Sequence, residues 1–291
     1  MNLVYYSLVV QSPHTEQWVQ SIRSLRRYNQ QISVHLFYYG FLDSSTLAEA
    51  DRQNVVLHSM GDYAQSFADY GNRQPVYAHF KHLHKFRNLH LLPQADQVLY
   101  LDCDTFLFAD VERLFATYRD AHWYSREEVM TRRSHFGYNP GWVNEEKLAD
   151  IADQNRVNRI TPCNTGVVLM NHQIWLTIAE YYENFLDFSW RLVVGAIGAH
   201  MKIDPELPEI RISDEDYRIA INYPAASVWI HDEIALWLTL NTIPELIDDT
   251  LNRGDVIQGS ETTPMPSQPV ILAHYWSSLR DKFFDQVPLI A

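Results

Sequence analysis

Cysteine is scarce in this 291-residue chain, which has only Cys103 and Cys163. Two cysteines cannot form the disulfide framework of a small secreted domain. The first residues also lack the basic segment and cleavage site of a signal peptide, because residues 3–6 already have the apolar character of a strand. These absences favour a reducing, cytoplasmic location.

Long hydrophobic runs and basic residues are also in short supply. No stretch approaches the roughly 20 apolar residues that a membrane-spanning helix needs. Lys and Arg number 23 against 36 Asp and Glu, which gives a formal net charge of -13. Such an acidic surface repels nucleic-acid phosphates and anionic lipid headgroups, so neither is an expected partner. An anionic small ligand would need a bound cation or converging basic side chains.

Glycine and proline are moderate at 10 and 13, and no repeat occurs at the periods of solenoid proteins. Hydrophobic residues make up 46% of the chain and charged residues 20%, which is an ordinary globular balance with ample material for a core. No linker divides the sequence. We therefore expect one domain that spans residues 1–291.

Strand-like and helix-like runs alternate along the first half of the chain. The predicted strands cover residues 3–10, 32–39, 55–58 and 97–101. One predicted helix begins after residues 12–13, and another spans residues 76–92. This alternation predicts an α/β fold with a mostly parallel, doubly wound sheet. The second half continues with predicted strands at residues 122–126, 166–170 and 270–273 and helices at 173–185 and 233–240.

An Asp-Cys-Asp sequence directly follows the buried strand at residues 97–101. Ligands of open α/β sheets bind outside the carboxyl ends of the strands. Residues i and i+2 of an extended segment point the same way, so Asp102 and Asp104 can converge while Cys103 faces inward. Carboxylate oxygens suit Mg²⁺ or Mn²⁺, with substrate phosphates completing the shell. The alternative is that Asp104 caps a following helix and Asp102 is solvated.

Residues 98–107, Val-Leu-Tyr-Leu-Asp-Cys-Asp-Thr-Phe-Leu, resemble the signature of the A-type glycosyltransferase fold. The resemblance is greatest to the family 8 enzymes, which include glycogenin-like and galactosyltransferase-like proteins. Further segments match in the same order, namely residues 21–26 with the strand at 32–39, Lys85, residues 164–171 and residues 271–275. The resemblance spans most of the chain, although residues 127–160 and 187–228 match nothing in it.

The resemblance implies one glycosyltransferase domain with helices on both faces of its sheet. Residues 1–125 would be the nucleotide-binding half and residues 126–291 the half that binds sugar and acceptor. The implied reaction moves a hexose from a UDP-sugar to an acceptor and retains the anomeric configuration. The acceptor, the identity of the hexose and the oligomeric state are left open.

The resemblance also implies residues that bind the donor. Ser7, Lys85 and Arg280 would contact the nucleotide and its diphosphate, and Asn164 and Gly166 would border the donor sugar. Arg280 stands where the family has Lys, and a guanidinium fork suits phosphate well. The glycine and proline that the family has around this position are missing here, where residues 277 and 281 are Ser and Asp.

His274 ends the last apolar strand, and the resemblance implies that it is a metal ligand together with Asp102 and Asp104. An imidazole beside two carboxylates shifts the preference from Mg²⁺ toward Mn²⁺, because nitrogen donors suit transition metals better. The alternative is a hydrogen-bonded histidine of the core.

Asp232 and Glu233 resemble the acidic pair that lies beside the reacting sugar in the family, which implies a catalytic role. They could instead be favourable acids at a helix N-terminus. Residues 214–216, Asp-Glu-Asp, are a rival for the same role, but they lack the Trp-x-x-Asp-Glu-x-Ala setting of residues 229–235.

Two other functions compete with glycosyl transfer. A sugar nucleotidyltransferase, or another metal-dependent phosphate-handling enzyme, is expected to have a basic, glycine-rich loop after the first strand. Residues 11–14 are Gln-Ser-Pro-His, without glycine, which counts against this function. A non-catalytic sugar-binding protein would tolerate loss of the metal ligands, yet all three are present.

Overall fold

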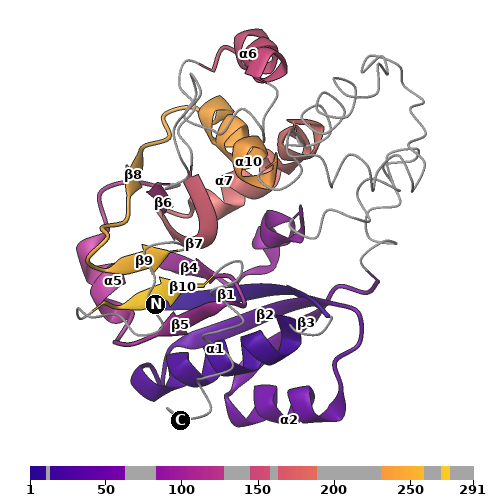
Figure 1. The fold of residues 1–291 in the computed structure, drawn as a ribbon, viewed down its shortest axis with the longest axis vertical. Helices are drawn as coiled ribbons and strands as arrows, with labels where there is room; N and C mark the ends of the chain where they lie inside the picture. Colours follow the sequence, from indigo (N-terminus) through magenta and orange to yellow (C-terminus); the bar gives the residue numbers. More distant parts are fainter. Residues whose placement is uncertain are drawn as a thin grey trace.

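The computed structural model describes residues 1–10, 14–62, 83–127, 145–157, 163–188, 231–258 and 270–275. Two sheets organise these residues, a large one of seven strands and a small one of three (Figure 1). The large sheet contains β1 (Asn2–Val9), β2 (Ser33–Tyr39), β3 (Val55–Ser59), β4 (Gln97–Leu101), β6 (Trp123–Glu127), β7 (Cys163–Asn171) and β8 (Asp248–Thr250). The small sheet contains β5 (Thr105–Leu107), β9 (Val256–Gln258) and β10 (Leu272–His274).

The strand order of the large sheet is β3-β2-β1-β4-β7-β6-β8. Neighbours are parallel from β3 through β4, and β6 and β8 are also parallel. Only β7 runs against its two neighbours, β4 and β6. The mostly parallel sheet predicted from the sequence is therefore confirmed. Because β7 is reversed, its first residues lie at the same rim as the carboxyl ends of β1 and β4.

Helices cover both faces of the large sheet, as predicted (Figure 1). One face packs against α1 (His14–Tyr28), α2 (Ser44–Arg52) and α5 (Glu112–Thr117). The other packs against α6 (Glu145–Gln154), α7 (Ile174–Glu180) and α10 (His231–Thr242). Strand β1 alternates between the two cores, which explains why its sequence is apolar almost throughout. No helix in the described ranges is long and apolar enough to cross a membrane.

Local sequence explains the first helices. Trp18, Ile22 and Leu25 recur at helical spacing on α1, and all three are fully buried against the sheet. Two arginines in the last turn of α1 complement the helix dipole. Helix α2 begins after Asp43, whose carboxylate accepts a hydrogen bond from the Thr46 amide at 2.7 Å.

The helix predicted for residues 76–92 is wrong in its described part. There the chain forms two short 3₁₀ turns, Leu83–Phe86 and Leu89–Leu91. Side chains of β1 donate hydrogen bonds to backbone carbonyls of the first turn. The Tyr5 hydroxyl donates to the Lys85 carbonyl at 3.2 Å, and the Ser7 hydroxyl donates to the His84 carbonyl at 3.3 Å. Leu92 is extended, as is usual for a residue before proline.

Candidate active site

The Asp-Cys-Asp sequence is the junction between the two sheets, because β4 ends just before it and β5 begins just after it. Strand β5 pairs antiparallel with β10, which sets Thr105 opposite His274. The Tyr275 amide also donates to the Asp104 carbonyl at 2.9 Å. This pairing brings His274 to the aspartates from far along the sequence. The cluster therefore joins the two sheets, because the aspartates follow a strand of the large sheet and His274 ends a strand of the small one.

Asp102, Asp104 and His274 form a group whose potential ligand atoms all lie within 4.8 Å of one another. His274 Nε2 lies 3.3 Å from Asp104 Oδ1 and 3.7 Å from Asp102 Oδ2. Two ligands about 2.1 Å from one ion, in neighbouring octahedral positions, are about 3 Å apart. The three groups therefore fit a divalent cation with a small adjustment. A strand follows Asp104, so this residue does not cap a helix.

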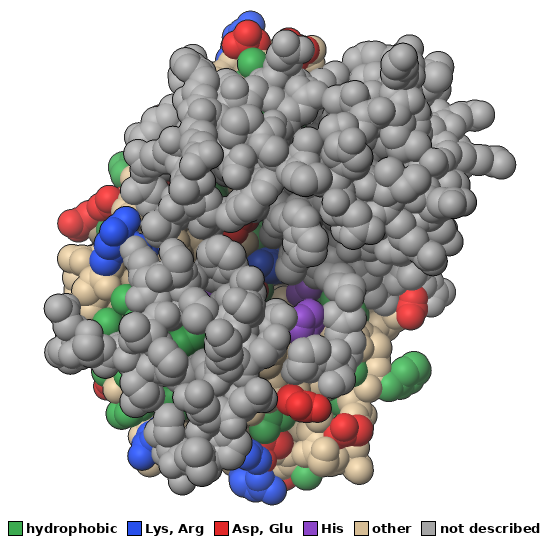
Figure 2. All heavy atoms as spheres, viewed as in Figure 1, with side chains coloured by type: hydrophobic (Ala, Val, Ile, Leu, Met, Phe, Trp, Pro, Cys, Tyr) green, Lys and Arg blue, Asp and Glu red, His purple; other side chains and the backbone are tan. Residues whose placement is uncertain are grey.

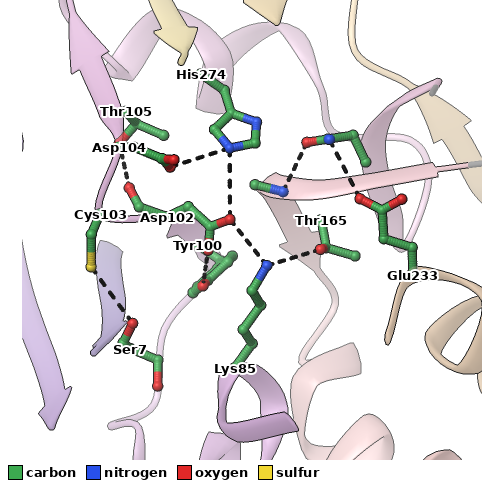
Figure 3. A network of polar contacts seen from close by, with 12 residues as sticks. Ser7, Lys85, Tyr100, Asp102, Cys103, Asp104, Thr105, Thr165, Glu233 and His274 are labelled. Carbon is green, nitrogen blue, oxygen red and sulfur yellow. Dashed lines mark hydrogen bonds and ion pairs between the residues drawn. The ribbon is translucent and has the colours of Figure 1, made fainter. Parts of the chain in front are cut away.

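The Asp102 carboxylate is held by hydrogen bonds on both oxygens (Figure 3). The Tyr100 hydroxyl donates to Oδ1. The Lys85 ammonium donates to Oδ2 at 3.0 Å and to the Thr165 hydroxyl at 3.1 Å. Lys85 is almost completely buried. Its charge therefore acts at close range on the negative rim, where solvent screens it little.

The His274 imidazole is buried between the small sheet and β7. A Cβ atom added to Gly166 would lie 2.1 Å from its Cε1 atom, so only glycine leaves room for the ring. Burial by itself lowers the pKa of His274, but the charges of Asp104 and Asp102 outweigh it and the net pKa is raised. The remaining ring nitrogen, Nδ1, is buried and makes no hydrogen bond within the described ranges.

Asn164 contacts both Gly166 and Glu233. The Asn164 side-chain oxygen accepts from the Gly166 amide at 2.9 Å, and its Nδ2 atom lies 3.4 Å from Glu233 Oε1. Glu233 is in the first turn of α10 and is largely buried. Asp232 precedes it on the same helix, and its side chain lies outside what the structure describes. Arg280 and residues 214–216 are outside the described residues altogether.

A cavity opens next to the aspartates, at the carboxyl end of β1. Its lining consists of Ser7, Leu8, Val9, His14, Gln17, His84, Lys85, Asp102, Cys103 and Asp104. The Ser7 hydroxyl already contacts His84, at 2.5 Å from Nδ1 and 3.3 Å from the carbonyl oxygen. In the space-filling view, histidine is visible near the middle of the face, and most of the coloured charged side chains, acidic and basic, lie toward its margins (Figure 2).

Several site residues were missed by sequence reasoning. Tyr100 lies two positions before Asp102 on an extended segment, so the period-2 rule could have found it. Thr165 lies between two predicted residues, and Gln17 carried no signal beyond its place on α1.

The cysteines are free, with Cys163 buried and Cys103 half-buried. Burial raises the pKa of the Cys103 thiol, and the charges of both flanking aspartates raise it further.

Solved structures that share this fold at low sequence identity include three glycosyltransferases. The galactosyltransferase LgtC, in complex with donor and acceptor sugar analogues, has a TM-score of 0.54 and 13% identity over 99% of this chain and 96% of its own. Mouse xyloside xylosyltransferase 1 has a TM-score of 0.50 and 12% identity over 94% of this chain and 97% of its own. The glycosyltransferase GlyE of Streptococcus pneumoniae TIGR4 has a TM-score of 0.51 and 13% identity over 98% of this chain and 60% of its own.

A search of the curated proteins finds no match. The family model for glycosyl transferase family 8 matches residues 7–187, which is more than half of the 291 residues. The match covers the end of β1, Lys85, the Asp-Cys-Asp junction and β7. The chain therefore belongs to glycosyl transferase family 8, and it shares its fold with solved glycosyltransferases.

Proposed function

We propose that this protein moves a hexose from a UDP-sugar to an acceptor with a divalent metal ion, Mn²⁺ in preference to Mg²⁺. The observation that carries the proposal is the convergence of Asp102, Asp104 and His274 from two sheets beside the buried Lys85. This cluster borders the cavity at the carboxyl end of β1. Parallel α/β sheets bind their ligands at such rims.

The donor set supports a metal ion of the transition series. Two carboxylates supply hard oxygen ligands, and the imidazole adds a nitrogen that Mn²⁺ accepts more readily than Mg²⁺ does. When bound, the ion would neutralise negative charge that develops on the leaving nucleoside diphosphate.

The cationic side chains of the site would bind the diphosphate. Lys85 is positioned by Asp102 and Thr165 next to the cavity, where its ammonium offsets the negative potential of an acidic protein. Arg280 would add a second, bidentate phosphate contact. Ser7 lies near the carboxyl end of β1 among the residues that line the cavity, where it would contact the nucleotide. Residues 1–125 would thus form the nucleotide-binding half.

Residues of β7 and α10 would handle the sugar. Asn164, Gly166 and Glu233 lie together, because the Asn164 side chain contacts both of the others. Glu233 and Asp232 would orient sugar hydroxyls or stabilise the positive charge that develops when the bond from C1 to the leaving oxygen breaks. By analogy with the family, we propose that the new bond forms on the same face, so the configuration is retained. Residues 126–291 would provide the half that binds the sugar and the acceptor.

The test is UDP release from a panel of UDP-hexoses, with Mn²⁺, with Mg²⁺ and in EDTA. We expect release from at least one donor with metal, faster with Mn²⁺, and none in EDTA. Asp104→Asn serves as the inactive control. A nucleotidyltransferase would instead form UDP-sugar from UTP and a sugar 1-phosphate, with release of pyrophosphate. A non-catalytic protein would bind the UDP-sugar and leave it intact, and either result would contradict the proposal.

A further inference from the structure

The two carboxylate oxygens of Asp102 have different surroundings (Figure 3). Oδ1 accepts a hydrogen bond from the Tyr100 hydroxyl. Oδ2 is the oxygen near the rest of the cluster, at 3.0 Å from Lys85 Nζ and 3.7 Å from His274 Nε2. Oδ2 is therefore the oxygen that contacts His274 and Lys85, and Oδ1 is the oxygen that Tyr100 holds.

Tyr100 is a fixed hydrogen-bond donor. Its side chain is completely buried on β4, with its ring centroid 4.9 Å from that of Tyr5 and 5.5 Å from that of Phe86. Packing of this kind locks a side chain in one rotamer. The hydroxyl therefore holds Oδ1 in place, and the carboxylate has little freedom to turn.

We propose that Tyr100 is a positioning residue that restricts Asp102 to coordination through Oδ2, and that it thereby selects Mn²⁺ and Mg²⁺ against Ca²⁺. The inference rests on the metal site proposed above. Ca²⁺ takes 6–8 oxygen ligands at about 2.3–2.6 Å and often binds a carboxylate through both oxygens, whereas smaller ions prefer octahedral sites at about 2.0–2.1 Å. A carboxylate with one oxygen held back by a buried hydroxyl suits the smaller ions.

The experiment is calorimetric titration of the full chain with Mn²⁺ and, separately, with Ca²⁺. Tyr100→Phe keeps the ring and removes only the hydroxyl. We expect its Mn²⁺ affinity to fall about 10-fold, a typical effect of losing a partner of a metal ligand. Its Ca²⁺ affinity should stay the same or rise, because the Tyr100 hydroxyl no longer holds Oδ1. The ratio of the two affinities should thus fall at least about 10-fold.

Tyr124→Phe is the matched control. Tyr124 is also buried, and its hydroxyl accepts hydrogen bonds from the Asp120 and Ala121 amides rather than from a site residue. Its affinity ratio should equal that of the wild type. The ratio does not depend on the fraction of folded protein, so a loss of stability in either variant leaves the comparison valid.

If the ratio of Mn²⁺ to Ca²⁺ affinity is unchanged in Tyr100→Phe, including the case in which both affinities fall by the same factor, the role of Tyr100 is overturned. The metal site itself would still stand. A wild-type protein that binds neither ion overturns the metal site itself, and this inference with it.

Discussion

The two sides of the metal cluster are built in different ways. The carboxylate side, Asp102 and Asp104, comes from one short stretch at the end of β4. Tyr100 and Lys85 support it through the hydrogen bonds on Asp102. The imidazole side, His274, comes from a strand of another sheet and depends on the pairing of that strand with β5. Local sequence positions the first side, whereas only long-range packing positions the second.

This difference separates two kinds of variant. A change at Asp104 on the carboxylate side should remove ion binding and leave the fold intact, because this side chain contributes little packing. A change on the imidazole side that moves the buried ring should affect ion binding and stability together.

Loss of a carboxylate should have the largest effect. Asp104 is the better choice, because Asp102 is also the counter-ion of the buried Lys85. In Asp104→Asn we expect UDP release to fall by more than about 1000-fold, since the ion is the main electrostatic support of the leaving group. The free energy of unfolding should change by less than about 1 kcal/mol. Enzyme assays and urea unfolding measure both, and a variant that still releases UDP at the wild-type rate would contradict the metal's role.

Gly166→Ala tests the imidazole side through its packing. The new methyl group would overlap the His274 ring, which has a buried strand on one side and the small sheet on the other. We expect a loss of about 1–3 kcal/mol in stability, as for other overpacked sites. Mn²⁺ affinity should fall about 10- to 100-fold because the ring must move.

The control for this variant is Gly254→Ala, whose added Cβ would come no closer than 3.4 Å to a neighbouring atom. Its stability and Mn²⁺ affinity should match the wild type. Wild-type Mn²⁺ affinity in Gly166→Ala would mean that the ring position does not matter for the ion.

His274→Ala sharpens the comparison by removing the nitrogen ligand and keeping both carboxylates. Mn²⁺ affinity should fall about 10-fold or more, and Mg²⁺ affinity should fall less, because Mg²⁺ gains little from a nitrogen donor. Titration calorimetry with each ion measures the two losses. Equal losses would show that the imidazole affects the site only through packing.

The smallest effect lies in the parallel part of the large sheet, outside both sides of the cluster. His35 Nδ1 is 3.0 Å from His58 Nε2 across β2 and β3. Burial, with the charge of His58 as a second cause, lowers the pKa of His35 from its ordinary value of 6.5 to about 4. The folded state therefore binds fewer protons than the unfolded state between these values. The contribution of the neutral His35 to stability is fully present above pH 6.5 and is lost as the pH falls toward 4.

Urea unfolding at pH 7 and pH 5 measures this effect. Solvent at the sheet edge screens part of the interaction, so we expect the wild type to lose about 1 kcal/mol from this pair. His35→Leu should lose less between the same two pH values. If both proteins lose the same amount, the acid sensitivity comes from elsewhere.

The sequence predicted the parallel strands and α1 well because each has a local signal. Continuous apolar runs indicate strands covered on both faces, and Trp18, Ile22 and Leu25 recur at helical spacing. The turn at residues 83–91 was predicted wrongly, because hydrogen bonds from β1 to its backbone carbonyls are tertiary contacts.

The candidate site likewise has parts with a local sequence signal and parts that depend on tertiary contacts. The aspartates were predicted from one strand and the period-2 rule. The small sheet was not predicted, because the pairing of His274 with Thr105 joins segments that are distant in the sequence. The space that Gly166 leaves for the imidazole depends on how two strands pack, and residue identity alone does not reveal it.

A crystal structure of the protein with Mn²⁺ and UDP, with anomalous data collected at the manganese edge, tests the central claim most directly. We expect one anomalous peak about 2.0–2.6 Å from Asp102 Oδ2, one Asp104 oxygen and His274 Nε2, with the diphosphate on the same ion. A peak away from these residues, or a His274 ring turned away from Asp102 while UDP is bound, would contradict the account.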